Sequence, residues 1–149
     1  MPSIALDLEV SDCQIPPSDF KPVINLYITN KWQKEWDGNK NNKLYEINPS
    51  IKRSSFYNFK SRHDQVVFTR CRLGHSRLTH GFLLIGEVPP LCLSCKVPLT
   101  IKHILLNCNF YDAARKRFYS ETCLHGIFEN VPPKCILDFL SYVKLKCFI

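Results

Sequence analysis

Apolar residues recur every three or four positions in several stretches of this chain, and this spacing predicts helices. The first stretch begins after Pro16-Pro17, where Ser18 or Asp19 can cap a helix and Pro22 falls in its first turn. Its apolar side chains recur every four residues, at Phe20, Ile24, Ile28, Trp32 and Trp36. We expect this aromatic face to be the main element of the core, although the same face can also stack bases.

Further helices are expected downstream. One runs from about Arg62 to Leu73 and ends at Gly74, a second follows Ser76 as far as Leu84, and a third covers Phe110–Tyr119 after Asn109. The last begins at Pro132-Pro133, and its apolar face is formed by Ile136, Leu137, Leu140, Val143 and Leu145.

The segments between these helices contain breaks. Leu44–Ile47 is predicted as a short extended piece, and Gly126 to Pro133 as an interruption. The pattern therefore predicts a mainly α fold, a small helical domain with little or no β-sheet. Residues 1–17 are acidic and lack Lys and Arg, so we expect an N-terminal arm at 1–17 and a single helical domain at 18–149.

A metal-ligand pattern lies at 91–111, in the sequence LCLSCKVPLTIKHILLNCNFY. Cys92 and Cys95 are separated by two residues, which suits a tight turn around one metal ion, and nearby prolines keep this turn out of a helix. Thr100 can cap a short helix that carries His103 in its first turn and places Cys108 just past its end. The spacing C-x2-C-x7-H-x4-C predicts a CCHC zinc knuckle that holds one structural Zn²⁺.

Other interpretations of these four residues remain open. Cysteines are numerous here, eight in 149 residues, so the four can be ordinary buried residues. A redox-active C-x-x-C motif is disfavoured because no strand-then-helix pattern surrounds it. His75 and His80 can be spare ligands, but neither is paired with a Cys at ligand spacing.

The chain is basic, with a net charge of +7 and a pI of about 9.0, which points to a polyanionic partner. Cationic residues gather on both sides of the predicted knuckle, and those that can meet phosphates are Arg70, Arg72, Arg77, Lys102, Arg115, Lys116 and Arg117. We expect the side chains at 115–117 to point mostly outward. Such a run can equally be a solvated face without a ligand.

The same composition bears on the compartment. Hydrophobic content of 45% and charged content of 22% are typical of globular proteins. The first ten residues lack the basic start and apolar core of a secretion signal, and no apolar run is long enough to cross a membrane. We therefore expect reduced thiols and an intracellular protein, in the nucleus or cytoplasm.

Three segments together resemble a known family. They are RCRLGHSRLTHGFLL from Arg70, the C-L-S-C motif at 92–95, and LTIKHILLNC ending at Cys108, preceded by IPPSDFKPVINLYITNKWQKEWDGNKNNKL. These segments are similar to the C-terminal tail of LINE-type (non-LTR, Jockey-like) retrotransposon polyproteins. The resemblance implies that Cys92, Cys95, His103 and Cys108 are the family's knuckle positions and that the module binds nucleic acid in support of reverse transcription.

The catalytic parts of such polyproteins have no counterpart here, because the clustered acidic residues of reverse transcriptase and RNase H are missing. We expect a detached tail without catalytic activity or a small-molecule substrate, which binds RNA or DNA, single-stranded rather than as a specific duplex. The alternative is a zinc-stapled helical module that binds protein through the helix at 20–36 or the C-terminal helix. A hydrolase that uses the metal is disfavoured, since four protein ligands leave no open position.

Overall fold

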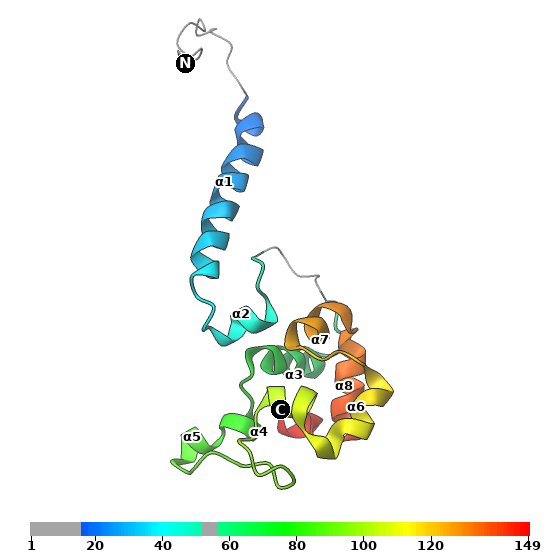
Figure 1. The fold of residues 1–149 in the computed structure, drawn as a ribbon. Helices are drawn as coiled ribbons and strands as arrows, with labels where there is room; N and C mark the ends of the chain where they lie inside the picture. The colour runs from blue at the N-terminus through cyan, green and yellow to red at the C-terminus, as the bar shows by residue number, and fades with distance from the viewer. Residues whose placement is uncertain (1–15, 52–56) are drawn as a thin grey trace, which may run out of the picture.

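The computed structural model describes residues 16–51 and 57–149, and these residues form helices joined by short loops (Figure 1). In chain order the elements are α1 Pro17–Asp37, α2 Lys43–Ile47, α3 Arg62–Leu73, α4 Arg77–His80, α5 Phe82–Ile85, the π-helix η2 His103–Asn107, the 3-10 helix η3 Asn109–Tyr111, α6 Asp112–Phe118, α7 Leu124–Asn130, α8 Pro133–Tyr142 and the 3-10 helix η4 Lys146–Phe148.

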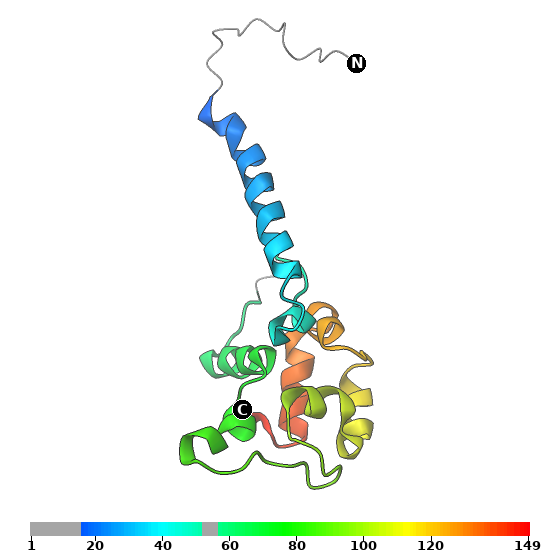
Figure 2. The ribbon, with the colours of Figure 1, turned by 60° about the vertical axis from the view of Figure 1, so that its left-hand side comes forward.

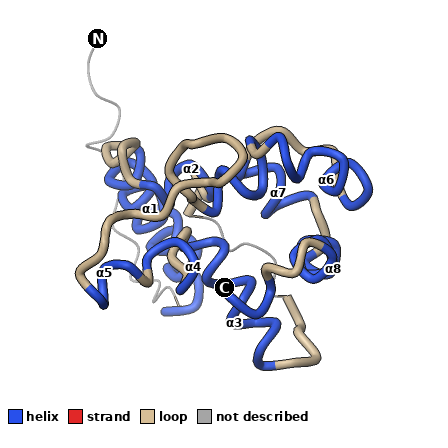
Figure 3. The backbone as a smooth tube through the Cα atoms, turned by 90° about the horizontal axis from the view of Figure 1, so that it is seen from below, coloured by secondary structure: helices blue, strands red, loops and turns tan. Residues whose placement is uncertain are grey.

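β-structure within the described ranges is limited to an isolated bridge between Leu91 and Pro98, and the tube in Figure 3 shows helices and loops alone. The prediction of a mainly α fold with little or no β-sheet is confirmed. None of the helices in the described part of the chain is long and apolar enough to cross a lipid bilayer.

The core is centred on α8 (Pro133–Tyr142), the helix that the apolar spacing after Pro132-Pro133 predicted. Ile136, Leu137, Phe139 and Leu140 are buried, and α8 packs against α3 and α6. The Phe139 ring meets three aromatic rings edge-on, those of Tyr111, Phe118 and Tyr119, at centroid distances of 6.4, 6.2 and 5.5 Å. Such edge-to-face geometry is favoured by the ring quadrupoles.

Two other helices complete this core. The predicted helix α3 is present and buries Val67, Phe68 and Cys71, and its C-terminal Gly74 has the left-handed backbone (φ 69°) expected of a helix-ending glycine. Phe68 contacts Phe128 of α7 edge-on at 5.6 Å. These contacts bring segments sixty residues apart into one apolar cluster.

The predicted break from Gly126 to Pro133 is wrong, because α7 occupies most of it. Leu124, Ile127 and Phe128 fall at helical spacing and are buried, and this apolar burial outweighs the helix-breaking tendency of Gly126. The glycine suits its place: its backbone N–H donates to Cys123 Sγ at 3.3 Å, and the Glu121 carboxylate lies where a side chain would go.

The helix predicted from the four-residue aromatic spacing is present as α1, but its expected role as the main core element is wrong. Figures 1 and 2 show α1 extending away from the other helices. Trp32 is 63% exposed and Ile24 is 53% exposed, and Trp36 alone of the five aromatic and aliphatic positions is half-buried. The helix therefore presents apolar side chains to solvent over most of its length.

The base of α1 is attached to the segment that follows it. Trp36 Nε1 donates to the carbonyl of Asn48 at 2.9 Å, and Gln33 Nε2 donates to the carbonyl of Pro49 at 2.9 Å. Neither Ser18 nor Asp19 caps the helix, which begins at Pro17 after Pro16. The rest of the predicted acidic arm at 1–17 lies outside the described residues.

The extended piece predicted at Leu44–Ile47 is wrong, since these residues belong to α2. The Asn42 side chain accepts a hydrogen bond from the Leu44 N–H at 2.9 Å and so provides an N-cap that favours a helix. Ile47 of α2 is buried in the core.

The helix predicted after Ser76 is present in two pieces, α4 and α5, which meet at Gly81. Ser76 and Thr79 form a reciprocal capping box at the start of α4, and Gly86 ends α5 with φ 68°.

Candidate metal centre

The first half of the site is a tight loop that carries Cys92 and Cys95. Its ends are joined by a hydrogen bond from the Leu99 N–H to the Pro90 carbonyl, and the Cys92 N–H donates to the Val97 carbonyl at 2.8 Å. Lys96 adopts a left-handed backbone (φ 58°), which closes the turn directly after Cys95. As expected from the flanking prolines, this segment is a turn and not a helix.

The second half begins with the predicted cap. Thr100 Oγ1 accepts a hydrogen bond from the His103 N–H at 3.0 Å, and His103 follows in the first turn of a helix. That helix becomes a π-helix, η2, in which the Cys108 N–H donates to the carbonyl of His103 at 2.7 Å. Cys108 then leaves the helix with an extended backbone (φ −68°, ψ 118°).

The π-helix explains how an H-x4-C spacing can supply two ligands to one site. In an α-helix, residues five apart are about 140° apart around the axis, so His103 and Cys108 would diverge. The wider i→i+5 turn brings Cys108 back beside His103, and π-turns of this kind are frequent at functional sites. The sequence predicted a helix between the two ligands but carried no sign of its wider turn.

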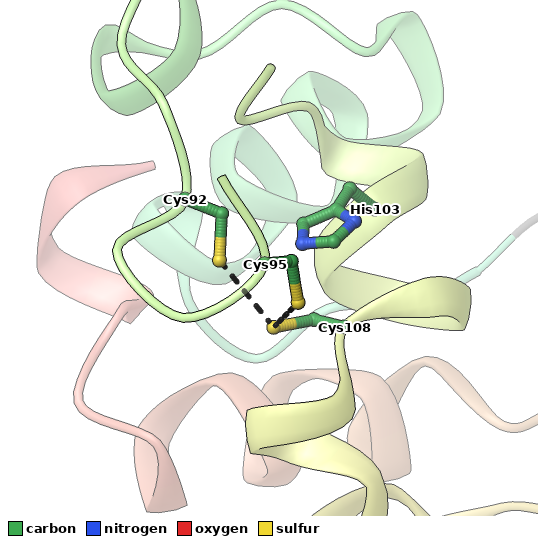
Figure 4. A group of neighbouring side chains, drawn as sticks. All are labelled: Cys92, Cys95, His103 and Cys108. Carbon is green, nitrogen blue, oxygen red and sulfur yellow. Dashed lines mark hydrogen bonds between the residues drawn. The ribbon is translucent and has the colours of Figure 1, made fainter. Parts of the chain in front are cut away.

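The four predicted ligands meet in one place, as Figure 4 shows. Their ligand atoms all lie within 4.8 Å of one another, and Cys108 Sγ lies 3.7 Å from Cys92 Sγ and 3.9 Å from Cys95 Sγ. Two thiolates bound to one zinc ion at tetrahedral geometry lie about 3.8 Å apart, so the sulfur spacing fits such an ion. The cluster can hold a metal ion.

His103 gives independent support for a metal ligand set. The side chain is 7% exposed, and its Nε2 is buried without a hydrogen-bond partner. A buried polar atom without a partner costs about 1–3 kcal/mol, so native proteins rarely leave one. A metal ion among the three sulfur atoms would satisfy this nitrogen.

The backbone around two of the cysteines already favours negative sulfur. The pKa of Cys92 is lowered to about 6, chiefly because the backbone N–H of Cys95 donates to its sulfur, with smaller contributions from the nearby His103 side chain and the Ser94 N–H. Burial raises the pKa of Cys108, while the N–H groups of Phe110 and Tyr111 oppose that rise. Both sulfurs therefore face N–H groups two and three residues ahead, an arrangement that orients and stabilises thiolate ligands.

The remaining candidate ligands lie elsewhere. Cys71 is a core residue whose pKa burial raises to about 12, and Cys123 and Cys147 are exposed. His75 and His80 stack on each other with ring centroids 3.9 Å apart, and His80 Nδ1 lies 2.8 Å from Thr79 Oγ1. They take no part in the cluster of four.

The predicted phosphate-binding residues fall in separate places. Arg70 and Arg72 belong to α3, Arg77 to α4 and the run 115–117 to α6. Several of these cations have partners. Lys102 pairs with Glu46 at 2.5 Å, and Arg70 donates to the Ile149 carbonyl at 2.7 Å.

The expectation that Arg115 points outward is wrong. Its side chain is 10% exposed, and its guanidinium donates to the backbone carbonyl of Cys108 at 2.7 Å. Its neighbours on α6 do face solvent: Lys116 pairs with Asp112 at 2.7 Å, and Arg117 lies over the Tyr142 ring. The helix itself begins at Asp112, after the 3-10 turn η3, rather than at the predicted Phe110.

Within the described ranges, the guanidinium groups of Arg72 and Arg77 have no hydrogen-bond or ion-pair partner. Arg77 is exposed in α4, whereas Arg72 is half-buried beside Trp36 and Leu44 at a cavity of about 420 Å³. Of the seven predicted phosphate contacts, the exposed ones are Arg70, Arg77, Lys102, Lys116 and Arg117, and among these five Arg77 alone has no partner in the described part of the chain.

Comparison of the chain with protein-family models, with curated proteins and with solved structures gives no match. The resemblance to LINE-type polyprotein tails therefore stays a prediction from the motifs.

Proposed function

We propose that Cys92, Cys95, His103 and Cys108 hold one structural zinc ion. The observation that carries this proposal is the convergence of four ligand atoms within 4.8 Å around an unpartnered, buried His103 Nε2. Thiolate and imidazole ligands in a tetrahedral set are typical of zinc. Four protein ligands leave no position for water or substrate, so the ion would hold the loop at 90–99 against η2 and would not catalyse a reaction.

The test is metal content measured together with folding. The chain, purified under reducing conditions, should contain one zinc ion, and chelation should loosen the structure, as followed by circular dichroism. His103→Ala should lose the ion, whereas His75→Ala should keep it because His75 lies outside the cluster. A folded chain that retains no zinc at neutral pH would end the proposal.

The folded module, in our proposal, binds single-stranded RNA or DNA. The net charge of +7 and the solvent-facing Lys116 and Arg117 support phosphate contacts. A hollow of about 440 Å³ opens beside Cys92 and Cys108, and Leu93 and Phe110, which line it, are 89% and 72% exposed. Exposed aromatic and apolar side chains suit unpaired bases, which stack without a specific duplex geometry. The family resemblance supports the same partner and a retrotransposon origin as a detached, non-catalytic tail.

Charge reversal can test the nucleic-acid proposal. The double variant Lys116→Glu/Arg117→Glu should weaken binding of a fluorescent single-stranded oligonucleotide and flatten its salt dependence, by a slope of about 0.7 for each phosphate that the protein no longer neutralises. Arg115 stays unchanged because it is buried. Lys31→Glu/Lys34→Glu, the same charge change on the distant helix α1, serves as the matched control. Equal weakening in both double variants would reduce the effect to net charge and refute a site on α6.

A second candidate function is protein binding through α1. This helix exposes Val23, Ile24, Leu26, Tyr27 and Trp32, each more than half accessible, and it extends away from the core in Figures 1 and 2. A row of large apolar side chains in solvent is typical of a docking face. Pull-downs that use the wild type and a Tyr27→Ser/Trp32→Ser variant as parallel baits test this function. The variant should lose protein partners that the wild type captures, while its nucleic-acid binding stays unchanged.

A further inference from the structure

We propose that Arg115 is a positioning residue of the metal centre. Its guanidinium, reaching across from α6, holds the backbone of the π-turn that sets His103 and Cys108 side by side. The inference rests on the proposed zinc site and assigns a role to a side chain outside the ligand set.

Arg115 Nη1 contacts backbone carbonyls within η2 and directly after it, and Nη2 contacts a carboxylate on its own helix. Nη1 donates to the carbonyl of Cys108 at 2.7 Å and makes a longer contact of 3.4 Å with the carbonyl of Ile104. Nη2 donates to the Asp112 carboxylate at 3.3 Å. The same guanidinium therefore contacts the ligand residue Cys108, the residue Ile104 that follows the ligand His103, and Asp112 on its own helix.

The location of these carbonyls explains why a cation is needed there. The last carbonyls of any helix lack partners within it, and at this end the partners come from other elements. Tyr119 Oη donates to the Leu105 carbonyl at 3.0 Å, and Arg115 Nη1 donates to the carbonyls of Ile104 and Cys108. A charged donor makes stronger bonds than a neutral one, and arginine offers several donors in one rigid plane.

The hydrogen bonds from Arg115 act on Cys108, the ligand at which the backbone leaves the helix. Cys108 leaves η2 with an extended backbone, and its sulfur lies against the N–H groups of Phe110 and Tyr111. The Cys108 carbonyl, fixed by Arg115, belongs to the peptide that joins Cys108 to Asn109. Holding this peptide places the following N–H groups of Phe110 and Tyr111 against the Cys108 sulfur. Without the hydrogen bonds from Arg115, the π-turn can relax toward α-helical spacing, which carries Cys108 away from His103.

Burial makes the role specific to this arginine. Arg115 is 10% exposed at its side chain, whereas Arg117, two residues later on the same helix, is exposed and bonds to Tyr142 Oη. The two arginines share residue type and helix but differ in contact with the metal centre. Arg117 therefore provides a matched control.

The experiment measures metal affinity on the full chain, by competition with a chromophoric zinc chelator, and records the absorption spectrum of the cobalt-substituted protein. Arg115→Met keeps the aliphatic stem but removes the donors, and we expect its zinc Kd to rise 10- to 100-fold, as for other residues that orient ligands. The d–d bands of cobalt should shift in this variant. Arg115→Lys should recover part of the affinity, and Arg117→Met should match wild type.

The outcomes separate the two proposals. A wild-type chain that binds neither zinc nor cobalt would overturn the metal centre and this inference together. A wild-type chain that binds metal, with Arg115→Met unchanged in Kd and cobalt spectrum, would overturn the positioning role alone. Lower thermal stability with an unchanged Kd and spectrum would likewise mark Arg115 as merely structural. If Arg115→Met does not fold, the Kd and spectrum of Arg115→Lys decide by the same criteria.

Discussion

Cys108→Ser isolates the contribution of the metal centre to stability. Cys108 is fully buried, and its sulfur lies 3.7 Å from Cys92 Sγ and 3.9 Å from Cys95 Sγ, so it is the ligand that the other two cysteines share as a neighbour. Replacing sulfur with oxygen removes one of four zinc ligands while changing little of the local volume. We therefore expect the variant to fold and to bind zinc far more weakly.

The magnitude follows from linkage between binding and folding. With free zinc held at 100 times the wild-type Kd, bound zinc stabilises the fold by about 2.7 kcal/mol. Partners that merely orient ligands change affinity by about 10- to 100-fold, so losing a ligand should cost at least a factor of about 100. The variant would then keep about 0.4 kcal/mol of zinc-linked stability. The loss of about 2.3 kcal/mol corresponds to roughly 5–9 °C in Tm.

The assay compares thermal unfolding in buffered free zinc with unfolding in chelator, for wild type and variant. Taking the difference for each protein removes the packing cost of a buried hydroxyl, which is present in both conditions. Cys147→Ser is the control, because this cysteine is exposed and lies outside the cluster. A Cys108→Ser protein that keeps the full zinc increment would refute the ligand assignment, as would a wild type with no increment.

Two further predictions concern the core and pH. Phe139→Ala should destabilise the chain by about 3–5 kcal/mol in urea titrations, because the ring is fully buried among Tyr111, Phe118 and Tyr119, whereas the exposed Phe110 should tolerate alanine within about 0.5 kcal/mol. The zinc-free protein should lose stability as pH falls from 9 to 6, because folding lowers the pKa of Cys92 from 9.0 to about 6 and favours its thiolate. Thiolate absorbance at low wavelength should follow this titration, and a Cys92→Ser protein that titrates identically in this range would contradict the assignment.

The sequence by itself determined the helical class and several helix ends. Apolar residues at helical spacing predicted α3 and α8, and the chemistry of Gly74 and Ser76 set boundaries that the structure reproduces. These features are local, because caps and left-handed glycines act within one turn of the chain. Ligand type and spacing likewise identified the four residues that meet at the candidate metal centre.

Only the tertiary structure decided which apolar faces are buried. The aromatic spacing of α1 is the same whether the helix packs or projects, so the sequence pattern placed Trp32 in a core that in fact forms around Phe139. The burial of Arg115 could not be predicted from the sequence for a similar reason. Its neighbours in sequence are solvent-facing cations, and its partners, the carbonyls of Ile104 and Cys108, belong to another helix. The π-turn that presents those carbonyls arises where the ligands must converge, which local propensity does not encode.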